Sequence, residues 1–194
     1  NDNIITAFAE KPKKPEVLKD FESAVNPDKP FLASMGIYVF NTDVLQAVLE
    51  EEYVDFGRDI LPQSIKKRRV CGYVFDGYWE DIGTIRRFFE VNLQMAKLDA
   101  PFDFYDAQAP IYTHARFLPG SELHNTRLDE VLLADGCRLY DASVRECVVG
   151  LRAIIGKEAS IQSSIIMGAD YYETDEDRAE NARRKRPDIG IGPN

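Results

Sequence analysis

A short repeat in the second half of the chain constrains the fold more than any other feature. From Asp135 onward, a small residue stands two positions before an aliphatic one, and successive aliphatic members are five or six residues apart. Helical periodicity does not give this spacing, and simple strand alternation does not leave a small residue so regularly in place. The pairs are Cys137/Leu139, Ala142/Val144, Cys147/Val149, Ala153/Ile155, Ala159/Ile161 and Ser164/Ile166.

A period near six residues is typical of a parallel β-helix, in which each short strand forms one side of a triangular coil. We expect the aliphatic residue of each pair to point into the coil and the small residue to fit where the chain turns a corner. A β-sandwich with short strands is the alternative, but spacing and residue size together favour the coil. Cys137 and Cys147 then become small core residues.

The first half of the chain has a different texture, because strand-like and helical patterns alternate up to about residue 105. Residues 4–8, 31–40 and 69–75 have strand character, and the run 31–40 is apolar enough to be covered on both faces. Helical patterns follow a cap at Asn41 or Thr42, cover residues 60–67, and follow a cap at Thr84. This alternation indicates a layered α/β sheet.

Composition excludes several classes of protein. The net charge of −9 over 194 residues disfavours a general nucleic-acid surface. Three cysteines without a Cys-x-x-Cys pair disfavour a disulfide framework or a zinc knuckle, and suit a reducing cytoplasm. No apolar run is long enough to span a bilayer, and no secretory signal is present, so we expect no membrane partner. The chain starts without Met almost on a strand, and we expect it to be an internal piece of a longer protein.

Glu10 and Lys11 are the first candidate binding residues. They directly follow the first strand-like run, and Pro12 forces the chain to leave the sheet there. Both would lie at the carboxyl end of a strand, where open α/β sheets bind ligands. A carboxylate accepts from sugar hydroxyls, and an ammonium neutralises a phosphate. A surface turn leading into the lysine-rich residues 11–14 is the alternative interpretation.

Two further motifs carry polar groups beside expected strands. Ser34 is a hydroxyl in an apolar run and needs a partner, and Gly36 would mark close approach of a ligand or another backbone. Asp81 lies in a turn between a strand and a helix, two residues after Trp79, the only tryptophan. It can bind a metal, take a proton, or simply form the turn. No second carboxylate is spaced with Asp81, so a metal partner would come from elsewhere in the fold.

Taken together, these motifs resemble the ADP-glucose pyrophosphorylase (glucose-1-phosphate adenylyltransferase) family over essentially the whole chain. The segment 167–175 is similar to the plant-type branch of that family. The earlier motifs, which occur in the family's order, are Glu10-Lys11-Pro12, Ala33-Ser34-Met35-Gly36-Ile37-Tyr38, Asp55-Phe56-Gly57, Tyr78-Trp79-Glu80-Asp81-Ile82-Gly83-Thr84 and Pro110-Ile111-Tyr112-Thr113.

The resemblance implies a fold and a reaction. The fold is part of a Rossmann-like nucleotidyltransferase domain over residues 1–105, followed by a linker and a left-handed parallel β-helix over 106–194. The reaction transfers an adenylyl group from ATP to glucose 1-phosphate with Mg²⁺, giving ADP-glucose for glycogen or starch and pyrophosphate. The family is cytoplasmic, usually homotetrameric and allosterically regulated, but no effector residue can be assigned from this sequence.

The resemblance also implies residue roles. Lys11 matches the lysine that holds the sugar phosphate, and Asp81 matches one of two metal-binding aspartates, so both are expected to be catalytic. Glu10 matches the carboxylate that binds glucose hydroxyls, and Ser34 matches a sugar-binding serine. The residues expected to line the sugar side are Asp55, Phe56 and Trp79.

One departure from the family is large. The glycine-rich nucleotide loop, the N-terminal Arg and Lys, and the first metal aspartate have no counterpart in the sequence. We therefore expect the sugar side of a site without its ATP side, and no turnover by the 194 residues alone.

Three alternatives remain open. A non-catalytic regulatory subunit could have the same fold, and a related nucleotidyltransferase could use another base or sugar. An acyltransferase could also have a β-helix, but it needs a histidine on the coil, and none lies among residues 137–166. His114 and His124 precede the coil and are expected to be surface or packing residues. The charge run 173–186 is expected to be a solvated excursion that Tyr171 and Tyr172 anchor or bring to a neighbouring subunit.

Overall fold

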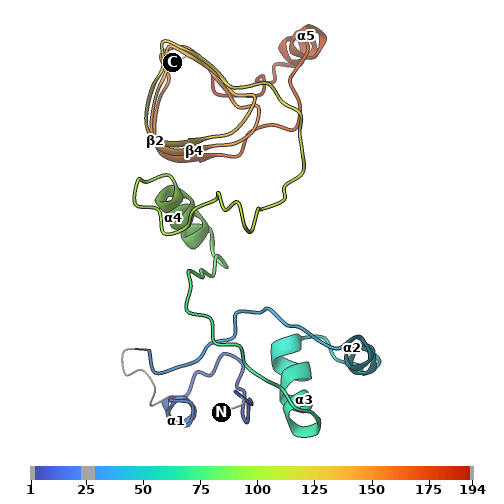
Figure 1. The fold of residues 1–194 in the computed structure, drawn as a ribbon. Helices are drawn as coiled ribbons and strands as arrows, with labels where there is room; N and C mark the ends of the chain where they lie inside the picture. The colour runs from blue at the N-terminus through green and yellow to red at the C-terminus, as the bar shows by residue number, and fades with distance from the viewer. Residues whose placement is uncertain (1–2, 23–28, 193–194) are drawn as a thin grey trace. The chain divides into compact units, whose positions relative to one another are not determined.

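The computed structural model describes residues 3–22 and 29–192, which form two compact units (Figure 1). The first unit spans Asn1–Trp79 and the second spans Glu80–Asn194.

The first unit is built around short helices. They are α1 (Pro15–Lys19), α2 (Thr42–Leu49), the π-helix η1 (Phe56–Ile60) and α3 (Leu61–Lys67), which continues directly from η1. The small core of this unit lies on α2, η1 and α3, where Val48, Ile60 and Leu61 are buried. The helices predicted after residue 41 and over residues 60–67 are therefore confirmed.

The predicted strands of the first unit do not form a ladder in the described residues. A single antiparallel bridge joins Ile4 to Cys71, and the amide of Ile5 donates to the carbonyl of Val70 at 2.8 Å. The prediction that residues 31–40 are covered on both faces is wrong, because Leu32 is 75% and Val39 is 97% exposed. An apolar run indicates which side chains a strand could bury. A strand forms, however, only where a second segment hydrogen-bonds to its backbone N–H and C=O groups.

The second unit contains a parallel β-helix. Strands β1 (Glu122–His124), β3 (Arg138–Tyr140) and β5 (Ile154–Ile155) form one sheet, and β2 (Arg127–Leu133), β4 (Ser143–Val149) and β6 (Ser160–Ile166) form another. All neighbouring strands are parallel and in register, so that Leu128 lies beside Val144, and Val144 beside Ile161. In Figure 1 the successive turns of the coil lie behind one another.

The small residues of the repeat stand next to the corners of this coil, as the sequence predicts. Each one directly follows a residue with positive φ, and those residues are Gly136, Asp141, Glu146, Arg152, Glu158 and Ser163. A left-handed conformation costs an L-residue about 1–2 kcal/mol. Hydrogen bonds between successive turns of the coil offset part of this cost. The side-chain amide of Asn125 donates to the Asp141 carboxylate at 3.0 Å, and the Ser163 hydroxyl donates to the Glu146 carboxylate at 2.9 Å.

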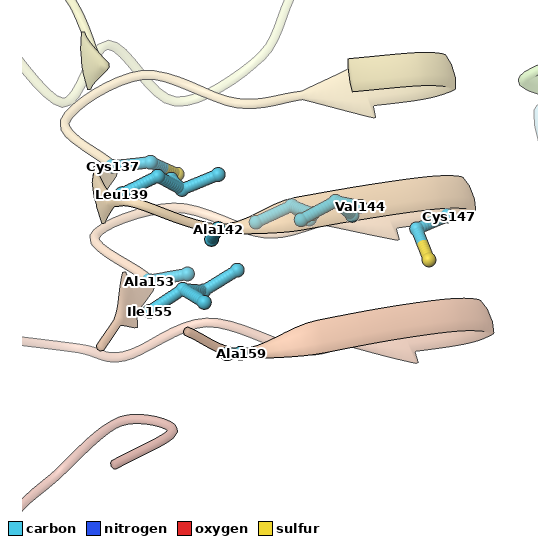
Figure 2. Close-up of a cluster of buried hydrophobic side chains, with 9 residues drawn as sticks. Cys137, Leu139, Ala142, Val144, Cys147, Ala153, Ile155 and Ala159 are labelled. Carbon is cyan, nitrogen blue, oxygen red and sulfur yellow. The ribbon is translucent and has the colours of Figure 1, made fainter. Parts of the chain in front are cut away.

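The core of the coil consists of the repeat itself (Figure 2). The fully buried side chains are Cys137, Leu139, Val144, Cys147, Val149 and Ile155, which confirms the predicted inward orientation. Burying an aliphatic side chain of this size contributes about 1.5–3 kcal/mol relative to leaving it exposed. Leu128, Val131 and Leu133 pack against this core as well, so the repeat begins earlier than the first pair found in the sequence.

A charged excursion interrupts the coil after β6. It contains helix α5 (Asp175–Arg184), which begins with a reciprocal capping box between Thr174 and Asp177. The chain then returns to the coil, where Ile191 forms a parallel bridge with Ile155. The predicted excursion is confirmed, and Tyr172 anchors it because its hydroxyl donates to the Gly136 carbonyl at 2.7 Å.

Helix α4 (Ile85–Met95) lies against strands β4 and β6 within the second unit. Its N-terminus is capped as predicted, because the Thr84 hydroxyl accepts from the amide of Arg87 at 3.1 Å. His124 lies in strand β1 of the coil, so the prediction that it precedes the coil is wrong. It stacks on Tyr140 with ring centroids 5.2 Å apart, which is the packing role expected of it. Within the described residues, the helices are too short or too polar to cross a lipid bilayer.

Candidate functional site

Glu10 and Lys11 form an ion pair at the end of the first extended segment. The Lys11 ammonium lies 3.5 Å from Glu10 Oε1, and the lysine side chain is 89% exposed, whereas that of Glu10 is 34% exposed. The backbone of Lys11 has φ of 42°, a left-handed conformation that is unfavourable for a lysine and more so before Pro12. Strained backbone of this kind clusters at binding sites, which gives the residue a second, independent signal.

The Asp55 segment is held rigidly at the start of η1. Asp55 caps the helix, since its Oδ1 accepts from the amide of Arg58 at 2.7 Å. The Asp59 carboxylate accepts from the amides of Val54 at 3.2 Å and Asp55 at 3.1 Å. The hydrogen bond from Arg58 to Asp59, with help from these amides, lowers the pKa of Asp59. π-helical turns are rare in proteins, and those that occur are often found at functional sites.

Glu10 reaches the Asp55 segment across Gly57. A Cβ atom at position 57 would lie 2.3 Å from Glu10 Oε2 and 3.5 Å from Asp55 Oδ1. The two predicted carboxylates therefore lie around one buried glycine, although they are far apart in the sequence. The prediction did not include Gly57, which appeared in the sequence only as part of the motif at residues 55–57.

Ser34 joins the same region through Tyr38. The hydroxyl oxygens of these two residues are 3.2 Å apart, and Ser34 Oγ also accepts from the amide of Gly36 at 3.2 Å. The Tyr38 ring stacks on Phe56, with centroids 5.5 Å apart and an interplanar angle of 15°. Phe40 lies 5.8 Å from Phe56 and completes the aromatic cluster.

The prediction for Gly36 is wrong for a neighbouring backbone. A Cβ atom there would meet nothing within 4 Å, so no other protein segment approaches closely. Its φ is 72°, a conformation that glycine adopts without strain. The residue therefore makes a bend that brings Tyr38 back to Ser34.

Five of the predicted residues thus form one continuous group, which we call the Glu10–Phe56 group. Its members are Glu10, Lys11, Ser34, Asp55 and Phe56. The group combines an ammonium, two carboxylates, a hydroxyl and an aromatic face. Such a set suits a ligand that has an anionic end, several hydroxyls and an apolar face. Tyr38 could not be recognised as the link from the sequence, where it stands only as part of the motif at residues 33–38.

Trp79 and Asp81 are the two predicted residues outside this group. Trp79 is the last residue of the first unit and is 43% exposed, whereas Asp81 belongs to the second unit. In the part of the chain that the structure describes, no hydrogen bond, ion pair or ring contact joins Trp79 to Glu10, Ser34 or Phe56. Asp81 Oδ1 accepts from the amide of Gly83 at 3.1 Å, which shapes the turn before α4.

Comparison with protein families identifies both parts of the chain. A nucleotidyl transferase model matches residues 1–97, which is half of the 194 residues, and a model of the GLGC left-handed parallel β-helix domain matches residues 116–194. The chain belongs to the nucleotidyl transferase family. The pairing of this domain with a GLGC-type β-helix matches an ADP-glucose pyrophosphorylase-like chain and identifies a sugar nucleotidyltransferase.

The family assignment confirms the predicted fold class, a nucleotidyltransferase domain of α/β type followed by a left-handed parallel β-helix. It also implies nucleotide and sugar-phosphate substrates for this nucleotidyl transferase. The domain boundary at residue 105 and the plant-type branch stay predictions. So do the roles of the individual site residues.

The carboxylate of Asp81 fits the Mg²⁺ ion that the resemblance to the ADP-glucose pyrophosphorylase family implies. Mg²⁺ is commonly held by one or two carboxylates together with substrate phosphates. No group of three or more acidic, His or Cys side chains that could hold a metal ion is found among residues 3–22 and 29–192. A carboxylate has more acceptor sites than the single bond to Gly83 uses, so Asp81 retains capacity for a cation.

Proposed function

We propose that this nucleotidyl transferase moves an adenylyl group from ATP to glucose 1-phosphate, giving ADP-glucose and pyrophosphate. The observation that carries the proposal is the Glu10–Phe56 group, in which the charged, hydroxyl and aromatic side chains expected for a hexose phosphate are linked by contacts. The GLGC-type β-helix supports the choice of ADP-glucose as product.

The residues of this group have separate roles in the proposal. The exposed ammonium of Lys11 binds the sugar phosphate and offsets its charge. Glu10 and Asp55 accept hydrogen bonds from sugar hydroxyls, and Ser34 adds a hydroxyl partner. Phe56 covers the apolar face of the ring. Trp79, which has no ring contact with Phe56 in the described residues, is proposed to line the sugar side.

The reaction needs these groups for positioning more than for covalent chemistry. An oxygen of the sugar phosphate bonds to the α-phosphorus of ATP, and the bond from that phosphorus to the oxygen of pyrophosphate breaks. Holding the nucleophile in line and neutralising charge supplies most of the rate enhancement in such transfers. Asp81 is the carboxylate that would hold Mg²⁺, whose charge offsets that of the phosphates.

The test is substrate kinetics of the full-length protein with Lys11→Ala. The Michaelis constant for glucose 1-phosphate should rise about 10- to 100-fold, as expected for loss of a hydrogen-bonded charge, while that for ATP stays nearly unchanged. Lys13→Ala is the matched control, since Lys13 is also exposed and lies two residues away. Equal effects of Lys11→Ala on both substrates, or none, would overturn the role proposed for Lys11.

The same assay separates the alternatives. A regulatory subunit of this fold binds glucose 1-phosphate without turnover. A nucleotidyltransferase with another base or sugar turns over a different substrate pair. Replacing ATP by other nucleoside triphosphates, and glucose 1-phosphate by other hexose phosphates, identifies the pair that is used.

A further inference from the structure

Gly57 occupies a place where glycine is not required by the backbone. It is buried within η1, and its φ lies outside the left-handed region that favours glycine. Glycine is a poor helix former, so its presence in a helical turn calls for another reason. No backbone atom outside the turn is among the nearest neighbours of a Cβ at this position.

The space beside Gly57 is filled by the carboxylate of Glu10. A methyl group at position 57 would lie 2.3 Å from Glu10 Oε2 and 3.1 Å from Glu10 Cδ. The first distance is far below van der Waals contact and the second is tight, so one of the two groups must move. The missing side chain of Gly57 is thus the space that the Glu10 carboxylate occupies.

Asp55 cannot take up this displacement, but Glu10 can. Asp55 Oδ1 would stand 3.5 Å from the methyl group, an ordinary contact, and it is fixed by the amide of Arg58 at 2.7 Å. Among the described residues, the Glu10 side chain is held by the exposed Lys11 alone, at 3.5 Å. A methyl group at position 57 would therefore push the Glu10 carboxylate aside and leave Asp55 in place.

We propose that Gly57 is a positioning residue, which sets where the Glu10 carboxylate meets the hydroxyls of the hexose and thereby the selectivity for the sugar. This rests on the proposed function, because it assumes that Glu10 binds those hydroxyls. Lys11 binds the phosphate, which all hexose 1-phosphates share. Glu10 accepts hydrogen bonds from hydroxyls, whose positions differ between epimers.

The experiment is a double-mutant cycle in the full-length protein with Glu10→Ala, Gly57→Ala and both changes together. Gly57→Ala should raise the Michaelis constant for glucose 1-phosphate about 10-fold or more, as for loss of a charged hydrogen bond. The constant for ATP should stay within about 2-fold. The preference for glucose 1-phosphate over galactose 1-phosphate should fall in parallel.

Non-additivity is the decisive outcome, because Gly57→Ala should change little once Glu10 is already alanine. Gly72→Ala is the matched control, since a Cβ there meets its nearest neighbour at an ordinary 3.6 Å and the φ is also not left-handed. That control should leave substrate binding and selectivity as in the unmodified protein.

The outcomes distinguish this inference from the proposed function. If Glu10→Ala leaves glucose 1-phosphate binding unchanged, the role proposed for Glu10 fails. If Glu10→Ala weakens binding but Gly57→Ala does not, or if the two effects add, the positioning role of Gly57 is overturned while that of Glu10 stands. If Gly57→Ala alone fails to fold, folding of the double variant Glu10→Ala/Gly57→Ala supports competition of the two groups for one space. If the double variant also fails to fold, the positioning role of Gly57 is overturned.

Discussion

The hydroxyl of Tyr172 donates a hydrogen bond to the carbonyl of Gly136, at 2.7 Å and 36 positions along the chain. The guanidinium of Arg138 lies over the same ring, 4.9 Å from its centroid. Tyr172 thus ties the start of the charged excursion to an earlier turn of the coil. The neighbouring Tyr171 is 59% exposed and offers a natural comparison.

The first prediction concerns this tie. Tyr172→Phe removes the hydrogen bond but keeps the ring under Arg138, so we expect a loss of about 1 kcal/mol in unfolding free energy. Tyr172→Ala should lose more, because the cation–π contact goes as well. Amide hydrogen exchange should speed up first in α5, and Tyr171→Phe should leave both measurements unchanged. A Tyr172→Phe chain with native exchange in α5 would show that the excursion is held elsewhere.

The second prediction concerns the core of the coil. Leu139→Ala removes a side chain with 0% exposure and should destabilise the second unit by about 2–5 kcal/mol. Leu132→Ala, at a position 36% exposed, is the control and should cost much less. Chemical denaturation followed by circular dichroism measures both. Equal losses at the two positions would contradict the inward and outward assignment.

The third prediction concerns pH. The pKa of Asp59 is lowered from its usual 3.8 by the hydrogen bond from Arg58, aided by the amides of Val54 and Asp55. A depressed folded-state pKa stabilises the protein above the unfolded value, and this contribution is lost as the pH falls through the folded value. Asp59→Asn should therefore lower the free energy of unfolding at pH 6. As the pH falls, the difference in this free energy between the two chains should shrink, because the unmodified chain loses the contribution of Asp59. Parallel stability curves for the two chains between pH 6 and pH 2 would refute the assigned cause.

The fourth prediction concerns the proposed metal residue. Asp81→Asn keeps an oxygen that can accept from the Gly83 amide, so the turn before α4 should survive while the negative charge is lost. In the full-length protein we expect a higher Mg²⁺ requirement and a lower kcat, with unfolding unchanged. Asp76→Asn, which changes an exposed carboxylate shortly before Asp81 in the sequence, is the control. An unaltered Mg²⁺ dependence would remove Asp81 from the metal site.

The coil was predictable from the sequence because its pattern is local. Cys137 and Leu139 stand two positions apart, and the same spacing recurs at every side of the triangle. These few residues determine which side chain is buried, where the corner lies and which residues form the strand. The excursion was predictable for the same reason, since a dense charge run cannot enter an apolar core.

The first unit was less predictable because its contacts join distant segments. The run 31–40 has the composition of a buried strand, yet the ladder partner that would cover it is not encoded in those residues. Glu10 meets Gly57, and Ser34 meets Phe56 through Tyr38, only once the chain has folded. The residue types predict a sugar-phosphate site, which stays a prediction, but they do not indicate the glycine and the tyrosine that connect these residues.

The return of the chain at Ile191 has a practical use. Ile191 pairs with Ile155 just as a strand of the next turn would, so the coil resumes as though nothing had intervened. The entropic cost of closing a loop grows only slowly with its length. A reporter peptide or a small fluorescent domain could therefore replace the tip of α5, with Tyr172 and Ile191 kept as its fixed ends.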